Sequence, residues 1–329
     1  MRTATWCLTL LWLAIPALPL PTAAAPDAAR LVERAFRRPR SVAHTGTVEV
    51  TVQGVAGTAL VKVACDGQGR ERREHVDGPA RGTVVLTDGR STWQRGAGGG
   101  LWKLLPPMAA ATGAWDRLRA NYDLRATGSA RVAGRASRIV EVVPRHPGNP
   151  KQVLWLDTDT ALVLRSEARR SSGEAATASV YTSVALGAPR GAALAAPKPE
   201  DVAPLTPPEQ WEECSSLAEV ERRVGERVPL PAELPPGYAL SGTYVHGCWR
   251  GISLPVLRYE DGVNALTLFV ARPGGRGWGR SLRWGGPGWC RVEQREGQQV
   301  ARSACRGYHY VLIGDHRPEA LEAMLRSIR

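Results

Sequence analysis

The chain has 329 residues, which is enough for two domains that each bury their own core. Its formal net charge is +12, carried almost entirely by arginine, and only 6% of its residues are aromatic. Such a basic protein would ordinarily suggest a nucleic-acid partner. The export signal described next excludes that partner and leaves anionic lipid headgroups, lipopolysaccharide phosphates or an acidic protein. A GC-rich coding genome is the alternative source of the charge, because Arg, Ala, Gly and Pro are enriched together.

The first 25 residues have the pattern of a secretory signal peptide. Arg2 precedes an apolar run from about Trp6 to Leu20, and the small residues Ala23–Ala25 follow it. The run is short for a membrane span and is interrupted by prolines. Cys7 lies inside the run, whereas lipoprotein acylation needs a cysteine just after it. We expect cleavage near Ala25 and a periplasmic or otherwise extracytoplasmic chain; a retained N-terminal anchor is the alternative.

Residues 26–187 are predicted to form an α+β domain. Apolar residues at helical spacing predict an opening helix over 28–36, which Pro39 ends. Strict alternation over 47–52 predicts a strand with one apolar face. Short strand-like runs separated by Asp-Gly turns follow, then a helix within 107–120, then more strands up to residue 186. This pattern predicts a strongly curved antiparallel sheet covered by helices.

The remaining sequence predicts a linker and a second, smaller domain. Residues 188–208 are rich in Ala and Pro, as in a semi-rigid linker. Residues 209–329 predict a short helix at 216–223, several strands, and a closing helix with Pro318 in its first turn. This second domain is also of the α+β class.

The cysteines are distributed unevenly between the two domains. Cys65 is alone in the first domain and is expected to be a buried free thiol, with pairing across domains as the alternative. In an exported chain, the four late cysteines predict two disulfides with three pairings open: Cys214, Cys248, Cys290 and Cys305. No C-x-x-C motif is present, which disfavours a zinc ribbon or a thioredoxin-like site.

Motifs of enzyme chemistry are absent from the sequence. No G-x-S-x-G, H-E-x-x-H, Walker A or Rossmann fingerprint occurs, and no two histidines have metal-binding spacing. Asp157 and Asp159 are interpreted as turn residues. We therefore expect no catalytic residue, no metal and no cofactor; an enzyme with scattered catalytic residues is the alternative.

Four strand-and-turn motifs occur in the first domain in a fixed order. They are residues 41–48, 72–78, 122–124 with 132–135 and 139–144, and 154–160 with 164–167. In these motifs, and in Pro-Pro-Gly-Tyr at 235–238, the chain resembles the RseB/MucB proteins, periplasmic regulators of the sigma-E envelope stress response. The resemblance implies an N-terminal domain similar to LolA and LolB, which is an unclosed β-barrel. Two departures are His44, where an aromatic residue is expected, and an insertion between Arg272 and Cys305.

The apolar strand faces are the first candidate site. A half-closed sheet capped by a helical segment would shelter an acyl chain, and each buried methylene would contribute about 0.8 kcal/mol. The proposed lining is Val48, Val50, Val52, Leu60, Trp93, Trp102, Leu105, Met108, Trp115 and Trp155. An ordinary core is the alternative, and only the family resemblance favours a cavity.

The second candidate site is a Gly-rich loop in which arginine and tryptophan alternate. Such residues can stack on and bind anionic or peptide ligands. The candidate partner surface is Arg276, Trp278, Arg280, Arg283, Trp284 and Trp289. The alternative is a long hairpin whose tryptophans pack on a disulfide.

Two functions follow from these features. The family resemblance implies an exported regulator whose second domain grips the extracytoplasmic part of a membrane-bound anti-sigma factor, while the first domain senses lipid or lipoprotein. The alternative is a lipid or lipoprotein carrier with no such partner. An anionic membrane surface is a further candidate partner, given the positive charge.

Overall fold

The structure is a computed structural model of the chain. It describes residues 28–38, 40–105, 114–170, 173–190, 194–204, 211–248, 252–272, 289–295 and 298–329. The predicted signal peptide, Met108 and the loop residues 276–284 lie outside these ranges. Within the described residues, no helix is long and apolar enough to span a membrane.

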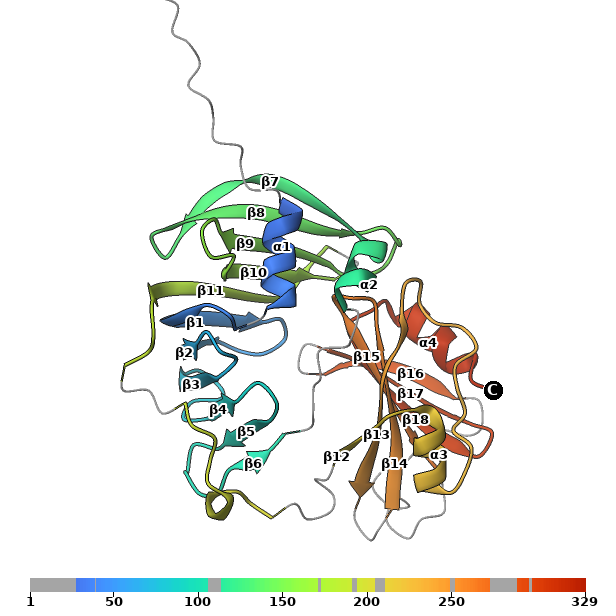
Figure 1. Cartoon of the computed structure of the whole chain (residues 1–329). Coiled ribbons are helices and arrows are strands. Elements are labelled where there is room, and N and C mark those ends of the chain that lie inside the picture. Colours follow the sequence, from blue (N-terminus) through green and yellow to red (C-terminus); the bar gives the residue numbers. More distant parts are fainter. Residues whose placement is uncertain are drawn as a thin grey trace, which may run out of the picture.

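The N-terminal domain is one antiparallel sheet of eleven strands in the order β6-β5-β4-β3-β2-β1-β11-β10-β9-β8-β7 (Figure 1). The strands are β1 (Ala43–Val52), β2 (Thr58–Asp66), β3 (Glu71–Asp77), β4 (Val84–Thr87), β5 (Thr92–Arg95), β6 (Lys103–Leu104), β7 (Tyr122–Val132), β8 (Arg135–Pro144), β9 (Lys151–Asp157), β10 (Val163–Arg169) and β11 (Ala175–Leu186). Because β6 and β7 do not pair with each other, the curved sheet stays unclosed. The predicted fold class is confirmed.

Helix α1 (Ala28–Arg37) lies across one face of this sheet (Figure 1). Its apolar residues recur every three or four positions, so they form one stripe. Leu31 and Val32 from that stripe are buried against Val140, Leu154 and other strand residues. Helix α2 (Ala114–Asn121) adds Leu118 to the same cluster. These two helices cover the half of the sheet formed by β7 to β10.

The C-terminal domain is a seven-stranded sheet in the order β12-β13-β14-β15-β18-β17-β16. The strands are β12 (Trp211–Cys214), β13 (Ala239–Cys248), β14 (Ile252–Glu260), β15 (Ala265–Ala271), β16 (Cys290–Arg295), β17 (Gln298–Cys305) and β18 (Tyr308–Gly314). Helices α3 (Leu217–Val224) and α4 (Pro318–Arg326) cover one face of it (Figure 1).

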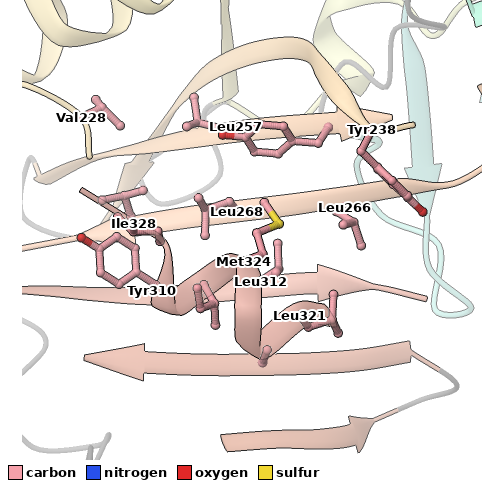
Figure 2. Close-up of a cluster of buried hydrophobic side chains, with 14 of the residues drawn as sticks. Val228, Tyr238, Leu257, Leu266, Leu268, Tyr310, Leu312, Leu321, Met324 and Ile328 are labelled. Atoms are coloured by element: carbon pink, nitrogen blue, oxygen red, sulfur yellow. The ribbon is translucent and has the colours of Figure 1, made fainter. Parts of the chain in front are cut away.

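The core of this domain lies between its sheet and its helices. Leu321 and Met324 of α4 lie over Leu268 and Leu312 of the sheet (Figure 2). Because side chains alternate along a strand, each of these strands sends every second residue into this core and the others to the opposite face. That opposite face is described below.

The cysteines do not form the predicted disulfides. Cys65, Cys214, Cys290 and Cys305 are all free thiols, so no bridge joins any two of them. Cys214 is buried in the core under α3 and α4, and Cys290 and Cys305 pack against that core. Packing therefore accounts for these three positions without a covalent bridge. The side chain of Cys248 lies outside the described part. Cys65 is buried and unpaired, as expected.

The predicted linker is partly attached to the N-terminal domain. Trp102 donates its backbone N–H to Asp201, and Ala203 donates to the carbonyl of Trp102, each at 2.7 Å. Val202 also packs on the small apolar cluster that contains Trp93 and Trp102. Hydrogen bonds and apolar burial therefore attach residues 201–203 to the N-terminal domain. The Ala- and Pro-rich composition of the segment did not predict this attachment.

Candidate functional site

A cavity of about 470 Å³ opens between α1 and the sheet. Its floor is the inward face of β1 and β2, where Val48, Val50, Val61 and Val63 alternate with residues that point the other way. The segment 160–163 and Tyr181 of β11 form the opposite wall. The cavity is therefore bounded by strands from both ends of the domain sequence, which meet where β1 pairs with β11.

Arginines surround this apolar floor. Arg34 and Arg38 come from the last turn of α1 and the residue after it, and Arg40 and Arg73 lie nearby on the turn and on β3. Arg34 donates to the carbonyl of Asp159 at 3.1 Å. Glu71 is the one acidic side chain in the cavity lining, and it pairs with Arg73 at 2.7 Å and with Arg40 at 3.5 Å. The lining therefore keeps a positive balance around a hydrophobic floor.

One end of the cavity carries a buried histidine–tyrosine pair. His44 Nδ1 lies 2.8 Å from the carbonyl of Val42, and Nε2 lies 2.8 Å from the hydroxyl of Tyr181. The carbonyl accepts only, so Nδ1 carries a proton, and in the neutral ring Nε2 then accepts from the hydroxyl of Tyr181. Burial raises the pKa of Tyr181, which keeps the hydroxyl protonated as this donor. A lone pair of its oxygen is left for a hydrogen-bond donor on a ligand.

His75 lines the cavity from β3. Burial, together with the charge of Arg73, lowers the pKa of His75 below its ordinary value. His75 is therefore neutral at neutral pH and adds no charge to the lining.

Of the nine predicted cavity residues that the structure describes, it brings two into this lining, namely Val48 and Val50. Trp93 and Trp102 form a separate cluster with Val84 and Leu86. Across the sheet, Trp93 is paired with Leu86, Leu86 with Arg72, and Arg72 with Ala64, so these side chains share one face. Ala64 follows Val63 of the cavity floor and therefore points away from the cavity, and the cluster does the same. These tryptophans therefore do not enclose the same space as the valines.

The other predicted lining residues also lie elsewhere. Leu60 precedes Val61 on β2 and so points to the other face. Trp155 lies between buried Leu154 and Leu156 on β9, faces away from α1, and stacks under the guanidinium of Arg165 at 4.4 Å. Trp115 packs on the core beneath α1 and α2. Val52 and Leu105 are half-buried outside the lining.

The residues that sequence reasoning missed are mainly the four arginines around the cavity floor and the pair His44–Tyr181. A signal for two of the arginines was present, because Arg34 lies on an amphipathic helix and Arg38 follows it by four positions, just past the end of the helix. No local signal linked His44 to Tyr181, since 137 positions separate them in the sequence.

A second concave surface lies on the face of the C-terminal sheet opposite its helices. It encloses about 480 Å³ and has an aromatic wall of Trp211, Tyr244 and Phe269. The ring of Trp211 meets those of Tyr244 and Phe269 edge-on, with centroids 6.4 and 5.8 Å apart. Arg258 and Asp315 add one charge of each sign. This surface, called the aromatic groove below, was not predicted.

Of the predicted partner surface, only Trp289 lies in the described part. Its carbonyl accepts from the N–H of Ala304 at 3.2 Å, next to the start of β16. Within the described residues, no group of three or more His, Cys, Asp or Glu side chains is arranged to hold a metal ion.

The family model and the relatives found by comparison with known proteins all point to MucB and RseB. Residues 44–205 match the family model of the MucB/RseB N-terminal domain. The sigma factor AlgU regulatory protein MucB of Pseudomonas aeruginosa is 28% identical over 264 residues, which cover 76% of each chain. The sigma-E factor regulatory protein RseB of Salmonella typhimurium is 27% identical over 133 residues, which cover 39% of this chain and 41% of RseB.

Solved structures share the fold over both domains. A chain from the Pseudomonas aeruginosa MucA/MucB complex superposes with a TM-score of 0.67 at 23% identity, covering 92% of this chain and 98% of that one. A chain from the crystal structure of MucB in complex with MucA(peri) gives a TM-score of 0.60 at 21% identity with the same coverage. Sequence motifs, family model and two-domain fold agree, and the chain belongs to the MucB/RseB family.

Proposed function

We propose that this protein is an exported, non-enzymatic regulator that binds the extracytoplasmic part of a membrane-bound anti-sigma factor. The observation that carries the proposal is the match of both domains to a chain of the MucA/MucB complex over 92% of this sequence. The curated relatives are named as regulatory proteins of sigma factors. The N-terminal signal-peptide pattern supports placement in the periplasm.

The cavity under α1 supports a sensing role for the N-terminal domain. Its valine floor suits an acyl chain, and burying each methylene would contribute about 0.8 kcal/mol. Its volume of about 470 Å³ is in the range of small-molecule sites. The arginines suit an anionic headgroup beside that chain. The proposed ligand is therefore lipid or the acylated end of a lipoprotein.

Helix α1 offers a route from this cavity to the second domain. Ala35 both lines the cavity and packs on the cluster of Leu31, Leu118 and Tyr122. Val263 of the C-terminal domain packs on that same cluster. A ligand that displaces α1 would thus act on a residue of the partner-binding domain. If the ligand binds the displaced state of α1 more tightly than the docked state, it would weaken the binding of the C-terminal domain to the partner.

The partner surface is proposed to be the C-terminal sheet face with its aromatic groove and the Arg/Trp loop that follows β15. Aromatic side chains that line a concave surface are typical anchors for a protein segment. The groove offers them at Trp211, Tyr244 and Phe269. The loop residues 276–284 and Trp289 stay proposed contacts.

Two adjacent residues on β2 allow a matched test of the cavity. Val61 lines the cavity and Leu60 points to the other face. Val61→Trp should fill the cavity and remove co-purifying acyl ligand from native mass spectra, whereas Leu60→Trp adds similar bulk without doing so. Stoichiometric acyl ligand in the Val61→Trp protein would contradict the cavity as the ligand site.

Recovery of the partner tests the regulatory role separately. Affinity capture of the full chain from membranes of its own organism should enrich one single-span protein, and deletion of the gene should change sigma-factor-dependent transcription. The alternative function is a lipid or lipoprotein carrier without a sigma-factor partner. Bound acyl ligand together with altered envelope lipid placement, and unchanged transcription, would favour the carrier and contradict the regulator.

A further inference from the structure

The two domains meet at a buried polar junction, which is defined here as Asn121, Tyr122 and residues 145–149 against residues 235–238, 260–264 and 315–317. Figure 1 shows α2 beside the upper end of the C-terminal sheet at this place. The surfaces approach closely: a Cβ atom on Gly262 would lie 2.3 Å from the backbone nitrogen of Leu118. The junction is therefore a fitted interface between the domains.

Asp261 is the acceptor at the centre of the junction. It is fully buried and accepts from the hydroxyl of Tyr122 at 2.5 Å and from Nδ2 of Asn149 at 3.2 Å, both in the N-terminal domain. Within its own turn it accepts from the backbone N–H groups of Val263 and Asn264 at 2.9 and 2.7 Å. Asn121 adds a bond from its Nδ2 to the Asp261 carbonyl at 2.9 Å.

His316 completes this network, and its position requires one protonation state. Its Nε2 donates to Oδ1 of Asn149 at 3.1 Å, because Nδ2 of Asn149 is already the donor to Asp261 and to the carbonyl of Pro236. Its Nδ1 lies 2.8 Å from the backbone N–H of Arg317 and must accept from it. A proton on Nδ1 would set two donors against each other in a buried site.

We propose that His316 is a proton-operated latch between the two domains: the junction stays closed while the imidazole is neutral and opens when it is protonated. The Nδ1 proton would remove the bond to Arg317, turn the ring, and release Asn149 from its place between His316 and Asp261. The inference concerns domain docking alone and stands whether or not the proposed regulatory function holds.

The charged neighbours of His316 act in both directions. Burial lowers the pKa of His316, Arg317 lowers it further, and Asp261 partly opposes them. A histidine whose pKa is lowered in the folded state stabilises that state above its ordinary value of about 6.5, and this stabilisation is lost as the pH falls toward the lowered pKa. The latch should therefore be closed at neutral pH and open in mild acid.

Three other titratable groups face the same region and need controls. Tyr238 meets the His316 ring edge-on at 5.8 Å, but burial raises its pKa, so it stays neutral throughout. Burial also raises the pKa of Asp315, which pairs with Arg170 across the domains at 3.3 Å. His146 contacts Oδ1 of Asn121 through Nε2 at 3.2 Å and could keep that bond as donor when protonated.

The test follows hydrogen exchange and small-angle scattering of the full chain without its signal peptide, from about pH 7.5 to about pH 4.5. After correction for the intrinsic rate, amide protection at Val263 and Asn264 should fall by about tenfold or more in acid, while the central strands of both sheets stay protected. The radius of gyration should rise over the same pH range.

His316→Gln supplies the matched variant, because a glutamine can donate to Asn149 and accept from Arg317 but cannot take a proton in this range. The His316→Gln protein should stay closed in acid, whereas His146→Gln and Asp315→Asn should open as the parent does. Opening of His316→Gln at the same pH as the parent would overturn the proposal. So would constant scattering and protection in the parent chain, a result that does not depend on any variant folding.

Discussion

Gly262 shows how a single residue can govern the contact between the domains. Its φ of +102° is one that L side chains rarely adopt, and an added Cβ would lie 2.3 Å from the nitrogen of Leu118. Neither condition can be relieved by a side-chain rotation, because the facing atoms belong to backbone. Glycine at this position is therefore required by both the turn and the interface.

We predict that Gly262→Ala lowers the free energy of unfolding by about 2–3 kcal/mol, from backbone strain and overpacking together. Chemical denaturation measures the loss. Gly134→Ala is the control, since Gly134 has a φ of +77° but no atom within 4 Å of the added Cβ. It should cost only the conformational part, about 1 kcal/mol. Equal losses in the two variants would mean that the close approach to Leu118 carries no energy.

Asp157 confirms at the residue scale that turn chemistry explains this carboxylate. It is buried and accepts from Nε of Arg135 at 2.6 Å and from the hydroxyl and N–H of Thr160 at 2.7 and 2.9 Å. These bonds hold the β9–β10 turn. That turn leads into residues 160–163, which line the cavity.

Asp157 should make the N-terminal domain sensitive to acid. Burial raises the pKa of Asp157, but the bonds from Arg135 and Thr160 outweigh this and leave it below the ordinary value. Its stabilisation is therefore present above a pH of about 4 and is lost below it as the carboxylate is protonated. Asp157→Asn should cost about 1–3 kcal/mol at neutral pH and flatten the loss of stability in acid, as measured by denaturation at several pH values. An unchanged pH dependence would contradict this.

At the scale of elements, the sequence predicted strands well and their faces poorly. The alternation over β1 and the stripe on α1 are visible in the sequence, and both elements form where expected. Alternation assigns Val48 and Val50 to one face but does not say that Trp93 of β5 points to the other. The relation between strands depends on the register and bulges of the whole sheet, such as the shift between Leu60 and Val61.

The last residue of α1 and the residue after it, Arg37 and Arg38, differ in role. Arg38 lines the cavity, whereas Arg37 pairs with Glu33 at 2.7 Å and lies over the ring of Trp115. Arg38→Glu should weaken binding of a long-chain fatty acid or other anionic amphiphile by about tenfold, with little change for an uncharged analogue. Arg37→Glu should leave both unchanged. Isothermal titration measures these affinities, and equal weakening for charged and uncharged chains would show that Arg38 acts on the fold of α1.

At the scale of the whole molecule, the junction is the feature that no local pattern could predict. Tyr122 and Asp261 are 139 positions apart, and each by itself reads as an ordinary strand or turn residue. The sequence motif Pro-Pro-Gly-Tyr at 235–238 marked the second domain but not the contact of Gly237 with Asn121. Composition likewise predicted a linker, but it did not predict the hydrogen bonds that attach residues 201–203 of this linker to Trp102.

The junction should make the two domains unfold as one unit. If one domain unfolded alone, the hydrogen bond between Tyr122 and Asp261 would break, and the domain that stays folded would lose the partner of its own junction residue. Calorimetry of the parent chain at neutral pH should therefore show a single transition. Tyr122→Phe removes the hydroxyl that donates to Asp261 and to which Asn264 donates at 2.8 Å. That loss should cost about 1–3 kcal/mol and separate the trace into two transitions. Tyr259→Phe is the control, since Tyr259 is buried in the C-terminal core; it should shift the midpoint and keep one transition. Two transitions already in the parent would contradict this prediction. They would mean that the domains unfold independently and that the hydrogen bonds of the Asp261 carboxylate do not couple their unfolding.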